Sequence, residues 1–393
     1  MDRIKAFAIK YKLPIIIIAA AVTATVVLAL IFSRFNKNNE SENRETETNS
    51  ETQTESTTEL MTVETEPETT EQEDVKLSYS NPLTGEMTAN DYSNVRPVAV
   101  MLNTIKEALP QSGNSKADIL IEMAEEGGIT RIMGIYQDLT GVGNIGTVRS
   151  TREYYLAWTR AFDAIMVHAG GDSWVLDEIK NSGEVTVNSL SNAGGTFWRD
   201  QERLKSVSIE HTLYTSSNNL QNWLSASGMS MAHTKQNYTV FNFTDELDEN
   251  LMTAAADSVK VTFSGYKSTT FNYNKESGCY DVYFWNNEPY MDESAKTQVS
   301  VTNIIVLPVP NWTDVDAWGK TRQKYNLSGG VGYYISGGKY TQINWTKGDY
   351  NKQNEYGNPL ILTNVNGEEL ELAVGKTYIC VVSNAFGVSI TGE

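Results

Sequence analysis

Two acidic residues, two glycines and an arginine stand close together in the stretch EEGGITRIMGIY, residues 125–136. Glu125 and Glu126 could act as general acid and base, a role that carboxylates fill within hydrogen-bond reach of a reacting atom. Arg131 could instead hold an anion, because a guanidinium group offers a planar fork of donors that suits carboxylates and phosphates. The same residues could also form an ion pair at the end of a hairpin, which contributes little at a surface.

Further residues with the same chemistry follow in the first half of the chain. Several come after glycines at predicted helix starts, where unpaired N–H groups favour anions. We expect either a binding site that gathers arginines or a catalytic site that gathers acids and histidines. The candidate ligand-binding residues are Arg131, Arg149, Arg152, Arg199 and Tyr214, and the candidate catalytic residues are Glu125, Glu126, His168, Asp200 and His211.

Some of these candidates have a structural alternative. Arg149 could pair with Glu153 at a helix start. His168 follows an apolar strand, and a histidine in that place could be a hydrogen-bonded core residue rather than a catalyst. His211 and Tyr214 could likewise be structural.

The candidates lie between elements that the apolar pattern predicts. Residues 96–103, 117–125 and 131–138 form apolar runs typical of strands covered on both faces. The link between the second and third runs is too short for a crossover helix. We therefore predict an antiparallel hairpin whose turn uses the positive φ of Gly127 and Gly128.

Helices are predicted after this hairpin. Residues 150–164 have helical spacing, with Ser150 or Thr151 as the expected N-cap. Residues 164–171 predict a buried strand, and residues 172–183 predict a short helix that begins at Asp-Ser and ends at glycine. This series predicts an α+β fold with a mixed sheet and packed helices.

The second half of the chain, residues 239–393, is rich in Tyr, Trp, Thr and Val and shows no helical period. It predicts an all-β sandwich or a partly open barrel. An irregular segment here carries Trp312 and Trp318, which could stack on sugars or belong to the core. Its Asp314 and Asp316 could bind calcium, but the full loop pattern is missing.

The amino-terminal end predicts a membrane anchor. Residues 14–32 carry no charge and are long enough to cross a hydrocarbon core of about 30 Å. The basic flank 1–13 favours a cytoplasmic amino terminus. A cleaved signal peptide is the alternative, but the run is long for one and lacks an A-x-A site. The polar, acidic residues 33–77 predict a disordered linker to two extracellular domains, 78–238 and 239–393.

Composition limits the classes of ligand. The formal net charge of −18 argues against a nucleic-acid partner, because phosphate-binding surfaces are usually basic. No metal or cofactor is expected, because no His-x-x-x-His or Cys-x-x-Cys spacing occurs and GVGNIG does not match the dinucleotide fingerprint. Cys279 and Cys380 could be buried thiols or form a single disulfide.

Several segments, taken in order, resemble the YerB family of Gram-positive envelope lipoproteins. The segments are NPLTGE, RPVAVMLN, PQSGNSKADIL, EEGGITRIMGIY, IGTVRSTR, FDAIMVHAGG and LYTS, followed by GGVGYYISGGKYTQINW and GKTYICVV in the second half. The resemblance implies a two-domain, membrane-tethered, extracytoplasmic protein and no particular reaction. The chain departs from the family in two places. A transmembrane segment replaces the lipid-bearing cysteine, and the family's PHN before LYT reads Glu210-His211-Thr212.

The resulting hypothesis is a membrane-anchored, single-pass envelope protein that acts as a binding or scaffold module. Its partners would be an anionic cell-wall polymer or an envelope protein. The alternative is a hydrolase or transferase that acts on a cell-wall glycan, with Glu125 or Glu126 and Asp200 as the acid and base. A third possibility is a protein-interaction platform formed by strand edges.

Overall fold

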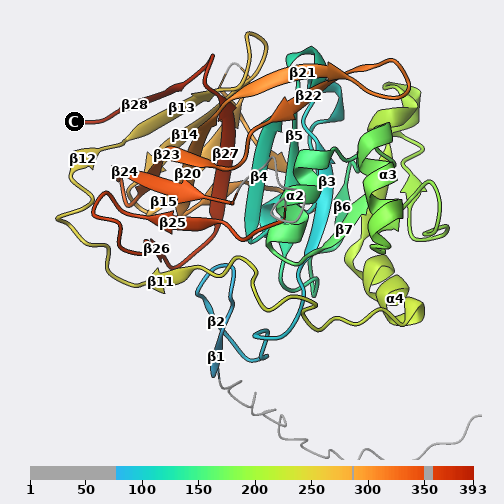
Figure 1. Ribbon diagram of the computed structural model, residues 1–393, viewed down its shortest axis with the longest axis horizontal. Coiled ribbons are helices and arrows are strands. Elements are labelled where there is room, and N and C mark those ends of the chain that lie inside the picture. Colours follow the sequence, from blue (N-terminus) through green and yellow to red (C-terminus); the bar gives the residue numbers. More distant parts are fainter. Residues whose placement is uncertain (1–76, 286, 349–356) are drawn as a thin grey trace, which may run out of the picture. The chain divides into compact units, whose positions relative to one another are not determined.

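The structure of the chain is a computed structural model that describes residues 77–285, 287–348 and 357–393 (Figure 1). The predicted basic flank, the predicted transmembrane segment 14–32 and nearly all of the predicted linker lie outside the described residues. Among the residues described, no helix is both long enough and apolar enough to cross a membrane.

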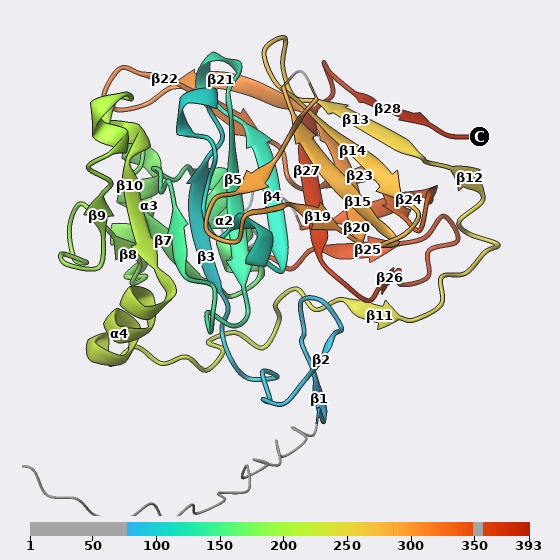
Figure 2. The same cartoon turned by 180° about the vertical axis from the view of Figure 1, so that it is seen from behind.

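A central sheet of eleven strands draws its members from both halves of the chain (Figures 1 and 2). Ten strands follow one another across it, and β25 (Ile361–Thr363) pairs with β24. In order they are β12 (Ala254–Ala255), β24 (Lys339–Thr346), β23 (Gly329–Ser336), β20 (Asn303–Val309), β27 (Thr377–Ser383), β4 (Ile119–Ala124), β5 (Thr130–Tyr136), β3 (Val98–Asn103), β7 (Ile165–His168) and β8 (Val187–Asn188).

The expected division at residues 238 and 239 does not divide this sheet. Strand β27 of the second half pairs in parallel with β4 of the first half, with Cys380 opposite Glu122. The expectation of a self-contained sandwich or partly open barrel in residues 239–393 is therefore wrong. Strand β27 is buried along its whole length and β20 along nearly all of it, and strands of this kind need cover on both faces.

The remaining elements lie around the central sheet. A six-stranded sheet comprises β16 (Glu288–Pro289), β15 (Cys279–Phe284), β14 (Ser268–Asn274), β13 (Ser258–Thr262), β28 (Val388–Thr391) and β19 (Ser300–Val301). Small sheets pair β1 (Tyr79–Ser80) with β2 (Met87–Thr88), β10 (Leu213–Ser216) with β6 (Asn144–Gly146) and β9 (Trp198–Arg199), β11 (Asn242–Thr244) with β26 (Glu371–Ala373), β17 (Met291–Asp292) with β18 (Thr297–Gln298), and β21 (Asn311–Val315) with β22 (Thr321–Tyr325). The α-helices of the described ranges are α2 (Glu153–Ala161), α3 (Ser173–Ser182) and α4 (Ser217–Ser227).

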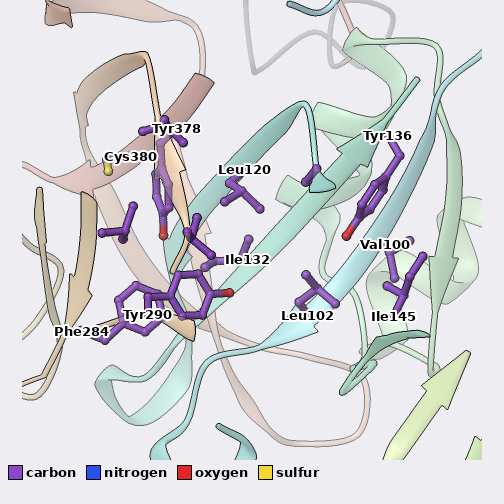
Figure 3. Close-up of a cluster of buried hydrophobic side chains, with 14 of the residues drawn as sticks. Val100, Leu102, Leu120, Ile132, Tyr136, Ile145, Phe284, Tyr290, Tyr378 and Cys380 are labelled. Atoms are coloured by element: carbon purple, nitrogen blue, oxygen red, sulfur yellow. The ribbon is translucent and has the colours of Figure 1, made fainter. Parts of the chain in front are cut away.

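The central sheet has an apolar core on each face. Alternate residues of β3 belong to different clusters, with Val100 in one and Met101 in the other. The Met101 cluster includes Trp158 of helix α2. In the Val100 cluster, residues of the central sheet meet Phe284 and Tyr290, which belong to β15 and to the residues just before β17 (Figure 3). Both halves of the chain therefore contribute to one interior.

A charged pair lies inside this interior. Glu122 of β4 and Lys267, just before β14, have fully buried side chains whose Nζ and Oε1 atoms are 3.2 Å apart. The hydroxyl groups of Thr269 and Tyr378 each donate to Glu122 Oε2 at 2.7 Å. Burial lowers the pKa of Lys267, although Glu122 opposes the shift. The pair joins the central sheet to the six-stranded sheet. Cys380, on the neighbouring strand, and Cys279 are free thiols.

The predicted hairpin is confirmed. Strands β4 and β5 pair antiparallel, and the turn between them holds Gly127 at φ 75° and Gly128 at φ 76°. A side chain with a Cβ atom is strained in this left-handed region, which is why glycines suit this turn.

The two predicted helices differ in how well their starts were predicted. Helix α3 begins as expected, because the Asp172 side chain accepts a hydrogen bond from the Val175 N–H, and it ends at Gly183 in the left-handed conformation. Helix α2 starts later than predicted. Its N-cap residue is Arg152, which makes no side-chain cap, rather than Ser150 or Thr151. The Arg152 side chain is engaged in an ion network instead.

Candidate functional site at the carboxyl ends of the parallel strands

Strands β3, β4, β7, β20 and β27 run in the same direction, so their carboxyl ends meet at one edge of the central sheet. Sheets with parallel strands commonly bind ligands outside this edge. Asn103, Glu125 and His168 lie at these ends, and Arg131 lies at the start of the antiparallel β5. The chain direction alone therefore gathers several predicted site residues.

The first group at this edge is an ion network of five side chains: Glu125, Glu126, Arg131, Arg152 and Asp172. Arg131 Nη1 lies 2.6 Å from Glu125 Oε2. Arg152 Nη2 lies 2.7 Å from Glu126 Oε2 and 3.4 Å from Glu125 Oε2. Arg152 Nε lies 3.6 Å from Asp172 Oδ2. The network joins the β4–β5 turn to the starts of helices α2 and α3.

The network is buried, and this burial affects both the pKa and the accessibility of its carboxyl groups. The Glu125 side chain is fully buried, and burial raises its pKa while Arg131 and Arg152 oppose the shift. Burial alone would raise the pKa of Glu126, but its bonds with Arg152 hold the pKa below the usual value. The predicted pair between Arg131 and Glu125 therefore exists, but inside the protein rather than at its surface. Glu125 is enclosed and has no open approach for a substrate.

The β21–β22 hairpin covers this network from the second half of the chain. Gln323 N–H donates to Glu126 Oε1 at 3.3 Å, and Arg322 Nη1 lies 3.6 Å from Glu126 Oε2. Lys324 lies over the ring of Trp174 in α3, 3.6 Å from its centroid. Sequence reasoning missed Arg322 and Gln323, because nothing local indicates contacts with residues nearly 200 positions earlier.

The same hairpin corrects the expectations for the tryptophan-rich segment. Residues 311–315 form a strand rather than an irregular segment. Trp312 and Trp318 are 44% and 56% exposed, so the core explanation is wrong for both. The Asp316 carboxylate accepts from the N–H groups of Trp318 and Lys320, and its second oxygen lies 2.9 Å from Arg322. Asp316 thus closes the hairpin turn.

The second group at this edge is partly exposed, and we call it the arginine patch: Arg149, Arg199, His211 and Glu210. Burial lowers the pKa of Arg199, and the positive charge of Arg149 adds to the shift. Arg199 donates to the Ile209 carbonyl, and Arg149 Nη1 donates to the Glu210 carbonyl at 3.3 Å, so the two guanidinium groups bind the carbonyls of consecutive residues. Arg149 Nη1 lies 3.3 Å from Glu210 Oε2. Two predicted ligand-binding arginines and a predicted histidine are thus brought together.

The tautomer of His211 follows from its neighbour Asn103. The Asn103 side-chain oxygen accepts from the Ile105 N–H, so the amide nitrogen donates to His211 Nδ1 at 2.9 Å. The proton of the neutral ring is then on Nε2, which lies 3.5 Å from Glu210 Oε1. Burial lowers the pKa of His211, and the positive charge of Arg149 adds to the shift while Glu210 opposes it. The patch therefore offers an Nε2–H donor beside its two arginines.

Comparisons with known proteins point to one family. Two family models described as "Protein of unknown function (DUF3048)" match this chain, the N-terminal domain at residues 83–230 and the C-terminal domain at residues 259–379, which together make up more than half of it. The chain belongs to the DUF3048 family. It is 28% identical over 316 residues to the "Putative lipoprotein YerB" of Bacillus subtilis (strain 168), which covers 79% of this chain and 88% of that protein. It also resembles the crystal structure of YerB from Bacillus subtilis, with a TM-score of 0.65 and 27% identity over 79% of this chain and 99% of that one.

The other predicted site residues of this DUF3048 protein have structural contacts. The Asp200 carboxylate accepts from the N–H groups of Glu202 and Arg203 and so caps a short turn. Tyr214 stacks with Trp198, with 6.2 Å between ring centroids. His168 is fully buried; its Nε2 pairs with Thr186 Oγ1 at 2.9 Å and its Nδ1 with the Gly170 carbonyl at 2.8 Å. These three residues do not converge on the arginine patch as free functional groups.

His168 gives this DUF3048 protein a specific pH dependence. Burial lowers the pKa of His168 from its usual 6.5 to about 4. Between these pH values the unfolded chain binds a proton that the folded chain does not, so stability present above pH 6.5 is lost as the pH falls toward 4. Between pH 7 and 4.5, we expect the wild type to lose about 2–3 kcal/mol more than a His168→Gln variant.

Urea unfolding of both proteins at the two pH values measures this difference. Groups that both proteins share, such as the buried Asp118, cancel in the comparison. Parallel loss of stability in the two proteins would show that His168 does not remain neutral in the fold.

Proposed function

We propose that this DUF3048 protein is a binding module of the cell envelope whose arginine patch holds an anionic group of an envelope ligand. The name of its Bacillus subtilis relative includes "lipoprotein", and residues 14–32 have the composition of a membrane anchor. Both support a place at the membrane. The ligand class follows from the chemistry of the patch.

One observation carries the proposal. Arg149 and the His211 Nε2–H lie within ion-pair distance of Glu210, and Arg199 donates to the carbonyl of the preceding residue, Ile209. Among the described residues, Glu210 is the one carboxylate within ion-pair distance of any of these donors. The Glu210 side chain is 54% exposed, so its charge is largely available to water. An arginine pair with so little internal compensation suits an external anion, which a guanidinium fork binds through charge-assisted hydrogen bonds.

The carboxylates do not favour the hydrolase or transferase alternative. Glu125 is enclosed by two arginines, Glu126 is bonded to Arg152, and Asp200 caps a turn. General acid–base work needs a carboxylate within reach of a reacting atom. The proposal is therefore restricted to binding.

Removing either arginine of the patch should weaken binding of a polyanion. We expect Arg149→Met and Arg199→Met each to raise the Kd for poly(glycerol phosphate) by at least about tenfold, since a hydrogen bond to a charged group contributes roughly 1.5–3 kcal/mol. Isothermal titration calorimetry with the full-length chain measures the effect. Added salt should weaken binding to the wild type, because it screens exposed charges.

Lys260→Met is the matched control. Lys260 is an exposed cation on β13 of the six-stranded sheet, and its removal changes the net charge by the same amount. Its Kd should stay close to that of the wild type. Equal losses in all three variants would indicate a nonspecific charge effect, and no binding by the wild type would refute the proposal for this ligand class.

A further inference from the structure

We propose that the Glu210 carboxylate occupies the anion-binding position of the arginine patch when no ligand is bound. Because a ligand must displace it, the patch selects phosphoryl groups over carboxylates. This inference rests on the proposed function, because it concerns which anion the same patch accepts. It adds a residue that determines specificity and a chemical class of ligand.

The contacts of Glu210 are those of a weakly held ligand. Its carboxylate bridges two of the three donors of the patch, 3.3 Å from Arg149 Nη1 and 3.5 Å from His211 Nε2. Charge-assisted hydrogen bonds of this kind are usually about 2.7–2.9 Å long. With more than half of its side chain in water, Glu210 can leave these donors at little cost.

The donors, in contrast, are fixed. The backbone N–H of Arg149 donates to the Met101 carbonyl at 2.9 Å, and its carbonyl accepts from the Ala169 N–H at 3.0 Å, so the residue is tied to β3 and the end of β7. Its guanidinium Nη1 donates to the Glu210 backbone carbonyl at 3.3 Å, a contact that does not depend on the Glu210 side chain. Asn103 holds the His211 ring. Glu210 itself lies on a single turn of 3₁₀ helix, Ile209–His211, and its side chain projects from it. When a ligand arrives, the carboxylate moves and the donors stay.

An internal carboxylate discriminates among external anions. Glu210 is attached to the site, so its effective concentration is in the millimolar range or above. A free carboxylate that displaced Glu210 would only replace one carboxylate–arginine contact with another, so the net gain in binding free energy would be small. Inorganic phosphate or a phosphomonoester brings up to two negative charges and at least three strong acceptor oxygens, which can engage Arg149, Arg199 and His211 together. Each unit of a phosphodiester polymer such as poly(glycerol phosphate) brings one charge and two such oxygens, and its neighbouring units add further charge. The phosphoryl group therefore displaces Glu210 where a carboxylate does not.

The test compares anion selectivity in the full-length wild type and in Glu210→Gln. Affinities for acetate, inorganic phosphate and poly(glycerol phosphate) are measured by titration calorimetry. We expect the wild type to bind phosphate at least about tenfold more tightly than acetate. In Glu210→Gln, acetate binding should improve most, so that the ratio of the two affinities falls by about fivefold. Glu249→Gln, at an exposed glutamate in the loop before β12, is the matched control and should keep the wild-type ratio.

The outcomes separate this inference from the function on which it rests. If the anions bind and Arg149→Met abolishes their binding, but Glu210→Gln leaves the selectivity unchanged, the role of Glu210 is refuted and the binding function stands. Equal affinity of the wild type for acetate and phosphate also refutes selection of phosphoryl groups. Failure of every anion to bind to any variant refutes both. Tighter binding of poly(glycerol phosphate) than of inorganic phosphate assigns the site to a polymer, and the reverse assigns it to a free phosphate.

Discussion

Arg131→Met is expected to lower the free energy of unfolding by about 3–5 kcal/mol, the usual cost of removing one member of a buried ion pair. The substitution leaves the Glu125 carboxylate, which is fully buried, without the partner that lies 2.6 Å away. Arg152, at 3.4 Å, is already engaged by Glu126 and Asp172 and compensates only in part. The shift in the midpoint of urea unfolding measures the loss.

Two variants show whether the charge is the cause. The double variant Arg131→Met with Glu125→Leu should recover much of the loss, because no uncompensated charge remains in the interior. Arg199→Met, in the arginine patch, should cost about 1 kcal/mol or less, because Arg199 is only half-buried and its guanidinium group donates to a backbone carbonyl, that of Ile209. A loss below about 1 kcal/mol for Arg131→Met would contradict a structural role for the ion network.

Lys267→Met should have a similar effect, also about 3–5 kcal/mol. It leaves Glu122 among the hydroxyl groups of Thr269 and Tyr378 without a counter-charge, at the contact between the two large sheets. Methionine keeps most of the apolar volume beside Phe284, whose ring lies under Lys267 Nζ, so the loss reports the charge rather than a cavity. Urea unfolding measures it.

The controls for this prediction use the same method. Lys267→Met combined with Glu122→Gln should be more stable than Lys267→Met alone, since the amide carries no charge. Lys260→Met, on the neighbouring strand and exposed, should stay within about 0.5 kcal/mol of the wild type. If Lys267→Met behaved like Lys260→Met, the buried pair would contribute nothing to the association of the two sheets.

Local structure could be predicted from sequence because its causes are local. Gly127 and Gly128 mark the turn of the β4–β5 hairpin, and Asp172 marks the start of α3. Apolar runs without polar alternation marked β3, β4 and β5 as strands buried on both faces, and all three are fully buried.

The sheet as a whole could not be predicted in this way. The pairing of β4 with β27 joins residues more than 250 positions apart, such as Glu122 and Cys380. Apolar runs identify both strands, but nothing in either run selects the partner. We therefore assigned the two halves to separate sheets, and the shared sheet shows that this assignment was wrong.

The sequence predicted which residues belong to the site better than it predicted what each of them does. Arg131 and Glu125 are neighbours through the hairpin turn, as the sequence indicated. Whether that pair is at the surface or inside depends on the β21–β22 hairpin. This hairpin lies nearly 200 residues later in the sequence, and its Gln323 contacts Glu126. Glu210 stood beside His211 in the sequence, but its contact with Arg149 depends on the fold.

Strand β27 lies in the middle of the central sheet although it is among the last segments of the chain. On a ribosome, the edge of β4 that will receive β27 is made first and waits for about 250 further residues, roughly 10–50 s at 5–20 residues per second. During that interval a nascent chain displays the unpaired edge of a strand that is apolar except for Glu122, and other chains can pair with such an edge. The central sheet of this protein can therefore be completed only after nearly the whole chain has been synthesised.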